Sequence, residues 1–227
     1  ICGYISDSGS QINKCSNSAE ITSSILTSSS SGISYSGGIC GFTSGENLIQ
    51  NSFNTGKISA YTSSSTSASC TSYTGGISGY GYSSSIKNSY NTGKISASSS
   101  GSRYAGGIIG YYDYNTSIIN CFAANEQVTN ITDLNKQMIG RIGGNTLYQT
   151  TTLNCYALNS MLVNGDVIIS SYTTNKNGKD TPLASFKDLT WLMTNMNWDF
   201  KKIWEVKPGG NFPTLRKEII AFDIPTM

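Results

Sequence analysis

The strongest constraint on the fold is a segment that recurs along the chain. The letters Gly-Gly-Ile-Cys-Gly-Phe at 37–42 return as Gly-Gly-Ile-Ser-Gly-Tyr at 75–80 and as Gly-Gly-Ile-Ile-Gly-Tyr at 106–111. A second half follows: residues 49–59 and 86–96 agree almost letter for letter. Self-similarity of this kind indicates a repeat architecture, in which each unit buries its apolar residues against the next.

Spacing within the copies predicts an all-β chain folded as a β-solenoid. Positions inside a copy are fixed over about 22 residues, whereas the spacers 60–74 and 97–105 differ in length. Gly and Asn supply the positive φ that turns between short strands require. We expect coils of about 22 residues, with the Ser- and Thr-rich spacers as irregular loop insertions. Each coil should hold three short strands, near 76–80, 85–90 and 94–97.

Stacking of coils about 4.8 Å apart should align equivalent side chains in ladders. The sequence predicts an Ile ladder (Ile39, Ile77, Ile108), an Asn ladder (Asn51, Asn88, Asn120, Asn154) and an aromatic ladder (Phe53, Tyr90, Phe122, Tyr156). Stacked amides hydrogen-bond along such a column, and stacked rings bury large areas. Whether Ser52 and Ser89 or their aromatic neighbours point inward is left open by the sequence.

Composition excludes two classes of partner. Charged residues make up 12% of the chain and the formal net charge is +2, so we expect no nucleic-acid binding surface. No apolar run approaches the roughly 20 residues of a membrane helix, so we expect no membrane insertion. The chain opens at Ile1, inside a repeat motif, which suggests a piece of a longer protein.

The C-terminal part has a different pattern. Ser185 and Asp188 resemble a helix capping box, followed by apolar residues at helical spacing. All three tryptophans lie between 191 and 204. We therefore divide the chain into solenoid repeats at 1–180 and a C-terminal α/β cap at 181–227, whose amphipathic helix and closing strands should cover the open solenoid end.

The repeat pattern resembles the GLUG repeat, which occurs in bacterial adhesins and in non-catalytic regions of IgA1-type peptidases. Residues 37–59 and 75–96 carry the closest match, 106–122 a good one, and 1–22 and 153–174 loose ones. The segment 198–216 is similar to one that closes such arrays. This resemblance implies a right-handed β-solenoid, an extracellular or cell-surface location, and no chemistry of its own.

Enzymatic chemistry is not expected. The chain has no histidine, which removes Ser-His-Asp and Cys-His catalysis and most imidazole metal ligation. Glycosidase-like catalysis needs paired carboxylates on one face. The acids of residues 1–110 share no repeat position, so we expect neither catalytic residues nor cofactor or metal sites.

Cysteines recur at two repeat positions. Cys2 and Cys40 share one, and Cys15, Cys121 and Cys155 share another. Small stacked apolar residues are the favoured interpretation. A disulfide between neighbouring coils, Cys2–Cys40 or Cys121–Cys155, is the alternative, although parallel side chains would strain it.

One aromatic column is a candidate ligand-binding surface, formed by Tyr4, Phe42, Tyr80 and Tyr111. A packing ladder beneath the loops is the favoured interpretation, and a row of rings that holds sugars is the alternative. We expect a non-catalytic structural or adhesive scaffold of a secreted or cell-surface protein. The alternatives are an adhesin module for glycans or host and matrix proteins, and a subunit that self-associates end to end through the solenoid ends.

Overall fold

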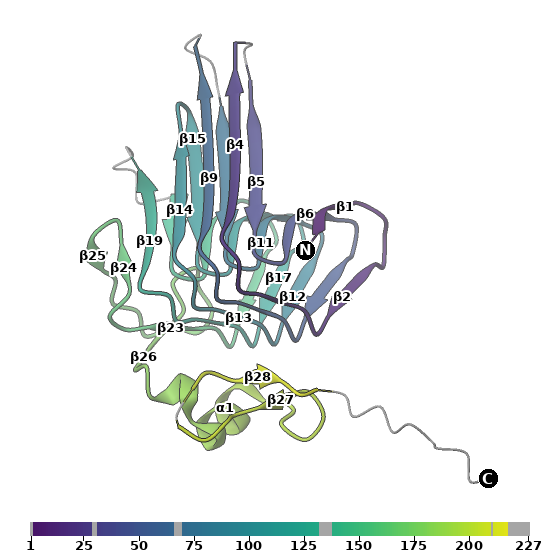
Figure 1. The fold of residues 1–227 in the computed structure, drawn as a ribbon, viewed down its shortest axis with the longest axis vertical. Helices are drawn as coiled ribbons and strands as arrows, with labels where there is room; N and C mark the ends of the chain where they lie inside the picture. Colours follow the sequence, from purple (N-terminus) through teal and green to yellow (C-terminus); the bar gives the residue numbers. More distant parts are fainter. Residues whose placement is uncertain (1, 29–30, 66–69, 132–137, 210, 218–227) are drawn as a thin grey trace, which may run out of the picture.

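The structure is a computed structural model that describes residues 2–28, 31–65, 70–131, 138–209 and 211–217. In these ranges the chain winds into a β-solenoid of about four coils, followed by a small region with a helix and a strand pair (Figure 1). The predicted all-β solenoid with a small C-terminal helix and strand region is confirmed.

Five sheets run along the solenoid, and successive coils add parallel strands to each. Sheet A holds β1 (Cys2–Ile5), β6 (Cys40–Ser44), β11 (Ser78–Tyr82), β16 (Ile109–Asp113) and β21 (Gly143–Thr146). Sheet B holds β2 (Gln11–Asn13), β7 (Leu48–Gln50), β12 (Ser85–Lys87), β17 (Ser117–Ile119) and β22 (Thr151–Leu153). Sheet C holds β3 (Ser16–Asn17), β8 (Phe53–Asn54), β13 (Tyr90–Asn91), β18 (Phe122–Ala123), β23 (Tyr156–Leu158) and β26 (Lys179–Thr181).

The other two sheets contain the longer strands. Sheet D holds β4 (Ile21–Thr27), β9 (Ile58–Ser64), β14 (Ile95–Ser99), β19 (Gln127–Ile131), β24 (Leu162–Val163) and β25 (Asp166–Val167). Sheet E holds β5 (Ile33–Gly37), β10 (Thr71–Gly75), β15 (Ser102–Gly106) and β20 (Ile139–Gly140). The hairpin β24–β25 is antiparallel and terminates sheet D.

Coils stack in the register that the repeats predict. The backbone N–H of Ile39 donates to the carbonyl of Ile77 at 3.0 Å, and that of Ile77 to Ile108 at 2.8 Å. All three isoleucines are fully buried, so the predicted Ile ladder is confirmed.

The predicted Asn ladder is also confirmed. Asn51, Asn88, Asn120 and Asn154 have φ between +47° and +54°, a turn conformation that Asn tolerates better than most residues. Their side-chain amides are linked from coil to coil at 3.4, 3.1 and 2.8 Å. The same residue type therefore makes the turn and connects the coils.

The serines next to the aromatic ladder point inward. Ser52 and Ser89 are fully buried. The Ser89 hydroxyl accepts from the N–H of Ser52 at 3.1 Å and donates to the carbonyl of Lys87 at 2.7 Å. Adjacent strand residues face opposite sides, so Phe53 and Tyr90 point out of the solenoid.

The described residues of the spacers lie mostly in strands, so the prediction of irregular loops was wrong there, while residues 66–69 lie outside the described residues. Each full coil has five strands rather than three, and the repeat distance along sheet A is 38 residues from Cys40 to Ser78 and 31 from Ser78 to Ile109. Along β9, Ile58, Ala60 and Thr62 are buried while Tyr61 is exposed. The period of two was hidden because Ser, Thr and Ala serve as core residues here.

Sheets D and E pack face to face to form a fin, defined as β4, β9, β14 and β19 against β5, β10 and β15, which projects from the solenoid (Figure 1). Small side chains fill its interior. The hydroxyls of Ser23 and Ser34 lie 2.6 Å apart, and Thr62 donates to Ser99 at 2.7 Å. Paired hydroxyls cost far less to bury than lone ones, and in the same interior the buried hydroxyls of Ser72 and Thr74 have no partner among the described residues.

The C-terminal region covers a side of the solenoid rather than its end. It contains the 3-10 turn η2 (Ser185–Lys187), helix α1 (Leu189–Met196) and the antiparallel pair β27 (Trp204–Glu205) and β28 (Thr214–Leu215). Its rings pack on the aromatic ladder of sheet C: Phe186 stacks on Phe122 at 4.5 Å, and Trp204 lies 5.9 Å from Tyr90. The predicted cap therefore screens an outward aromatic row from water.

Helix α1 begins one turn later than the capping-box pattern suggested. Asp188 is its N-cap, and the carboxylate accepts from the N–H of Trp191 at 3.0 Å. Ser185 lies in the preceding 3-10 turn instead. Leu192 and Met196 are fully buried, so the helix turns a narrow apolar stripe to the solenoid.

Candidate functional site

The structure brings the predicted aromatic column together. Tyr4, Phe42, Tyr80 and Tyr111 come from β1, β6, β11 and β16, with ring centroids 4.7, 5.1 and 5.3 Å apart and planes within 21° of parallel. Exposure falls along the column, from 61% at Tyr4 to 6% at Tyr111. Stacking between coils is thus one role of these rings.

A second column stands beside the first, and it was not predicted. Tyr35, Tyr73 and Tyr104, from β5, β10 and β15, stack at 5.3 and 5.0 Å. They meet the first column edge to face, with Tyr73 5.2 Å from Tyr80 and Tyr104 4.8 Å from Tyr111. We call the two columns together the aromatic corner, because it lies where sheet A meets sheet E.

A sequence signal for the second column exists. Each member stands two residues before a Gly-Gly pair, in Tyr35-Ser-Gly-Gly, Tyr73-Thr-Gly-Gly and Tyr104-Ala-Gly-Gly. Sequence reasoning missed it because these tyrosines were assigned to irregular spacers. A spacer residue at a constant distance from a repeat motif belongs to the repeat.

The corner presents hydroxyls rather than ring faces. Neighbouring coils cover the ring faces within each column, except that Tyr4 and Tyr35 of the first coil stack on one side only, and Tyr35, Tyr73 and Tyr104 remain partly exposed. Within the part of the chain that the structure describes, their hydroxyls make no hydrogen bond, and the three residues are half-buried. The corner therefore offers a row of solvent-facing donors and acceptors at the coil spacing.

Burial raises the pKa of three phenols of the corner, Tyr73, Tyr80 and Tyr111, above the ordinary tyrosine value of about 10. It raises the pKa of Tyr80 to about 12, and the negative charge of Asp113 adds to the effect. The pKa values of Tyr73 and Tyr111 are raised for the same main reason, burial. The hydroxyls accordingly act as donors as well as acceptors over the physiological range.

Cys2 and Cys40 lie opposite each other in the β1–β6 ladder, as their shared repeat position predicts. Both are free thiols in the structure, which does not contain the Cys2–Cys40 disulfide that the sequence suggested. Burial, followed by the neighbouring Cys2, raises the pKa of Cys40 to about 12. Parallel strands keep the two side chains side by side, which suits packed thiols better than a bridge.

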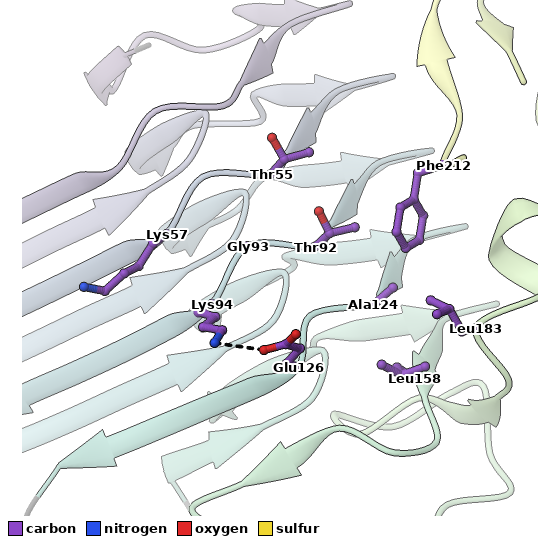
Figure 2. Close-up of a pocket in the computed structure, with 10 residues that line it drawn as sticks. All are labelled: Thr55, Lys57, Thr92, Gly93, Lys94, Ala124, Glu126, Leu158, Leu183 and Phe212. Atoms are coloured by element: carbon purple, nitrogen blue, oxygen red, sulfur yellow. Dashed lines mark ion pairs between the residues drawn. The ribbon is translucent and has the colours of Figure 1, made fainter. Parts of the chain in front are cut away.

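A groove of about 400 Å³ lies between the solenoid and the C-terminal region (Figure 2). The solenoid wall carries threonines and ion-paired lysines, and the opposite wall carries Leu183 and Phe212. Lys94 pairs with Glu126 at 2.8 Å, which lowers the pKa of that carboxyl. This groove was not predicted, because it joins residues far apart in the sequence.

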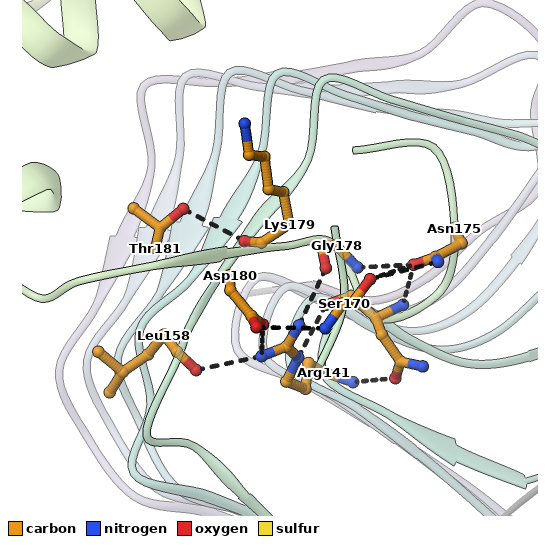
Figure 3. Close-up of polar contacts among 9 residues, drawn as sticks. Arg141, Leu158, Ser170, Asn175, Gly178, Lys179, Asp180 and Thr181 are labelled. Carbon is orange, nitrogen blue, oxygen red and sulfur yellow. Dashed lines mark hydrogen bonds and ion pairs between the residues drawn. The ribbon is translucent and has the colours of Figure 1, made fainter. Parts of the chain in front are cut away.

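The last coil is closed by a buried arginine (Figure 3). Arg141 stands where the second glycine of the Gly-Gly pair stands in the preceding coil, since Gly106 pairs with Gly140. Its fully buried guanidinium donates to the carbonyls of Asn177 and Gly178 at 2.9 Å each and pairs with Asp180 at 2.6 Å. A Cβ on Gly107 would lie 2.1 Å from the Arg141 carbonyl. Residues 176–178 stack on this position in place of another Gly-Gly segment, since the N–H of Ile142 donates to the Lys176 carbonyl at 2.9 Å, and the Arg141 side chain binds their carbonyls.

Clusters of potential metal ligands are not found in the described ranges. No group of three His, Cys, Asp or Glu side chains could hold a metal ion there. No helix in these ranges has the length and hydropathy to cross a membrane.

The fold and its ladders define a parallel β-solenoid repeat protein. Residues 71–96 and 101–129 match the family model described as the GLUG motif, so the chain contains GLUG repeats in these two segments. No curated protein matches the sequence.

A solved structure shares the fold. It is a candidate immunoglobulin A1 protease from Bacteroides ovatus, with a TM-score of 0.66 and 22% sequence identity. The match covers 94% of this chain and 62% of the other, so this chain spans less than two thirds of that protein. At this identity the likeness shows the fold alone.

Proposed function

We propose that the chain is a non-catalytic repeat scaffold of a secreted or cell-surface protein, and that the aromatic corner is its adhesive surface. The observation that carries the proposal is the row of tyrosine hydroxyls along the corner, repeated at the coil spacing and without partners among the described residues. GLUG repeats and a neighbour named as a candidate immunoglobulin A1 protease support the location.

An extended polymer is the ligand that such a row fits. Each coil offers the same groups about 4.8 Å further along the axis, so a chain that lies along the solenoid would meet several weak contacts at once. Linked weak contacts raise the overall affinity far above that of one contact. Glycans and extended segments of host or matrix proteins both have this form.

End-to-end assembly is the second candidate, and the geometry supports it less. At the N-terminal coil, β1 to β4 are edge strands with unpaired backbone groups. At the other end, Arg141 and the segment around Asp180 occupy the place of a further coil. The two ends are therefore not complementary.

The experiment is binding of the whole chain to arrays of glycans and matrix proteins, with Tyr73→Phe/Tyr104→Phe as the variant. Phe42 shows that phenylalanine fits these columns, so stacking and stability should persist while two hydroxyls are lost. We expect saturable binding to one ligand class and a loss of about tenfold or more in the variant, from about 0.5–1.5 kcal/mol per hydrogen bond. Binding that is unchanged in the variant, or no binding to any ligand, would reject the adhesive surface.

A further inference from the structure

We propose that the groove of Figure 2 binds a neutral pyranose ring, the terminal unit of a glycan. It is formed by the junction of sheets C and D with the C-terminal region, whereas the aromatic corner lies on sheets A and E. The proposal goes beyond the adhesive corner and does not depend on it.

The C-terminal wall is apolar and open to solvent. Leu183 is 43% exposed, and it faces the groove beside the ring of Phe212 and above Leu158. The volume lies in the range of about 300–1,000 Å³ that is usual for small-molecule sites. The ammonium of Lys187 lies 5.2 Å from the centre of the Phe212 ring, so Leu183 is the exposed apolar group of this wall that can pack on the C–H face of a sugar ring.

The opposite wall supplies hydroxyls. Thr55 and Thr92 follow Asn54 and Asn91, which pair in the β8–β13 ladder, so the two threonines stand one coil apart. The Thr92 hydroxyl makes no hydrogen bond within the described residues. The Thr55 hydroxyl donates to the Asn17 carbonyl at 3.4 Å, so it can serve a ligand as an acceptor, whereas Thr92 can both donate and accept.

The charged side chains at the groove favour a neutral ligand over a charged one. Lys94 pairs with Glu126 and Lys57 with Glu20, each at 2.8 Å, so the lysines at the groove are already neutralised. An anionic ligand would have to displace these carboxylates. A neutral hydroxyl can instead accept from a lysine and donate to the Glu126 carboxylate without breaking the pair, in charge-assisted bonds stronger than neutral ones.

The test is saturation-transfer NMR and titration of the full chain with a panel of neutral methyl pyranosides, with methyl glycosides of uronic acids alongside. We expect one or more neutral glycosides to bind with a Kd on the order of 1 mM, as suits a single small ring. Thr92→Val keeps the shape and removes the hydroxyl, so the affinity should fall about 3- to 10-fold. Leu183→Asp should abolish binding.

Two controls separate this site from others. Thr22→Val changes an exposed threonine of β4 outside the groove and should leave the affinity unchanged. Tyr73→Phe/Tyr104→Phe should also leave groove binding intact, even if the corner binds nothing. The proposal is overturned if no neutral pyranoside binds the folded chain, if only acidic glycosides bind, or if Thr92→Val and Leu183→Asp both bind as the parent chain does.

Discussion

Stacking of coils explains why glycine recurs in the repeat, and one pair of substitutions tests this. Gly79 and Gly3 occupy the same position of the motif in different coils. A Cβ on Gly79 would lie 2.6 Å from the carbonyl oxygen of Gly41 and 2.8 Å from the amide nitrogen of Ser36. A Cβ on Gly3 would meet nothing within 4 Å, because no coil stacks on that side of Gly3 in this chain.

The expected cost follows from these contacts. Neither glycine has a positive φ, so alanine brings no backbone strain and only the close approach matters. Overpacking by a single group costs about 1–3 kcal/mol and more when the neighbour is rigid backbone. We expect Gly79→Ala to lose about 3 kcal/mol or more. Gly3→Ala should be neutral or gain up to about 1 kcal/mol, because alanine restricts the unfolded chain.

Thermal and urea unfolding of the two variants measure the difference. For a chain of this size, about 3 kcal/mol corresponds to a fall in Tm of roughly 6–12 °C. The reasoning is refuted if both variants unfold alike, or if Gly79→Ala is as stable as the parent chain.

Three further predictions concern packing, the closed end and pH. Trp204→Ala removes a fully buried ring that packs on Phe53 and Tyr90, and should cost about 3–5 kcal/mol with loss of near-UV circular dichroism. Arg141→Gly leaves Asp180 without its cation and should lower the free energy of unfolding by about 3–5 kcal/mol, measured by urea unfolding. An unchanged urea midpoint would show that the arginine does not close the coil. Folding raises the pKa of Tyr80 from 10 to about 12, so between these pH values the unfolded chain loses the Tyr80 proton and the folded chain keeps it. The free energy of unfolding is therefore retained below pH 10 and falls between pH 10 and 12. Absorbance at alkaline pH should show this phenol titrating late, and Tyr80→Phe should remove part of the fall.

The solenoid could be predicted because its signals are local and repeated. Ile39 and Asn51 recur at fixed spacing, and each has a role that its chemistry makes plain, burial for one and a left-handed turn for the other. The aromatic column through Phe42 and Tyr80 followed from the same alignment.

The fin could not be predicted from the spacing of apolar residues along the sequence alone. Sequence patterns treat serine and threonine as surface residues, yet Thr62 and Ser99 are buried against each other across neighbouring coils. The second tyrosine column and the groove were missed for related reasons. The second tyrosine column stands on a spacer strand. The groove is lined by both Thr92 and Phe212, which come from parts of the chain that share no sequence pattern.

The most direct test of the account is hydrogen–deuterium exchange of the spacer strands, because the aromatic corner exists only if they form sheet E. In β10 (Thr71–Gly75), Thr71 donates to the Gly32 carbonyl at 2.8 Å and the strand is paired on both sides, with β5 and β15. Its amides should therefore exchange as slowly as those of β11 (Ser78–Tyr82). Exchange of 71–75 at the rate of an unstructured peptide, with 78–82 protected, would contradict the fin and remove the corner.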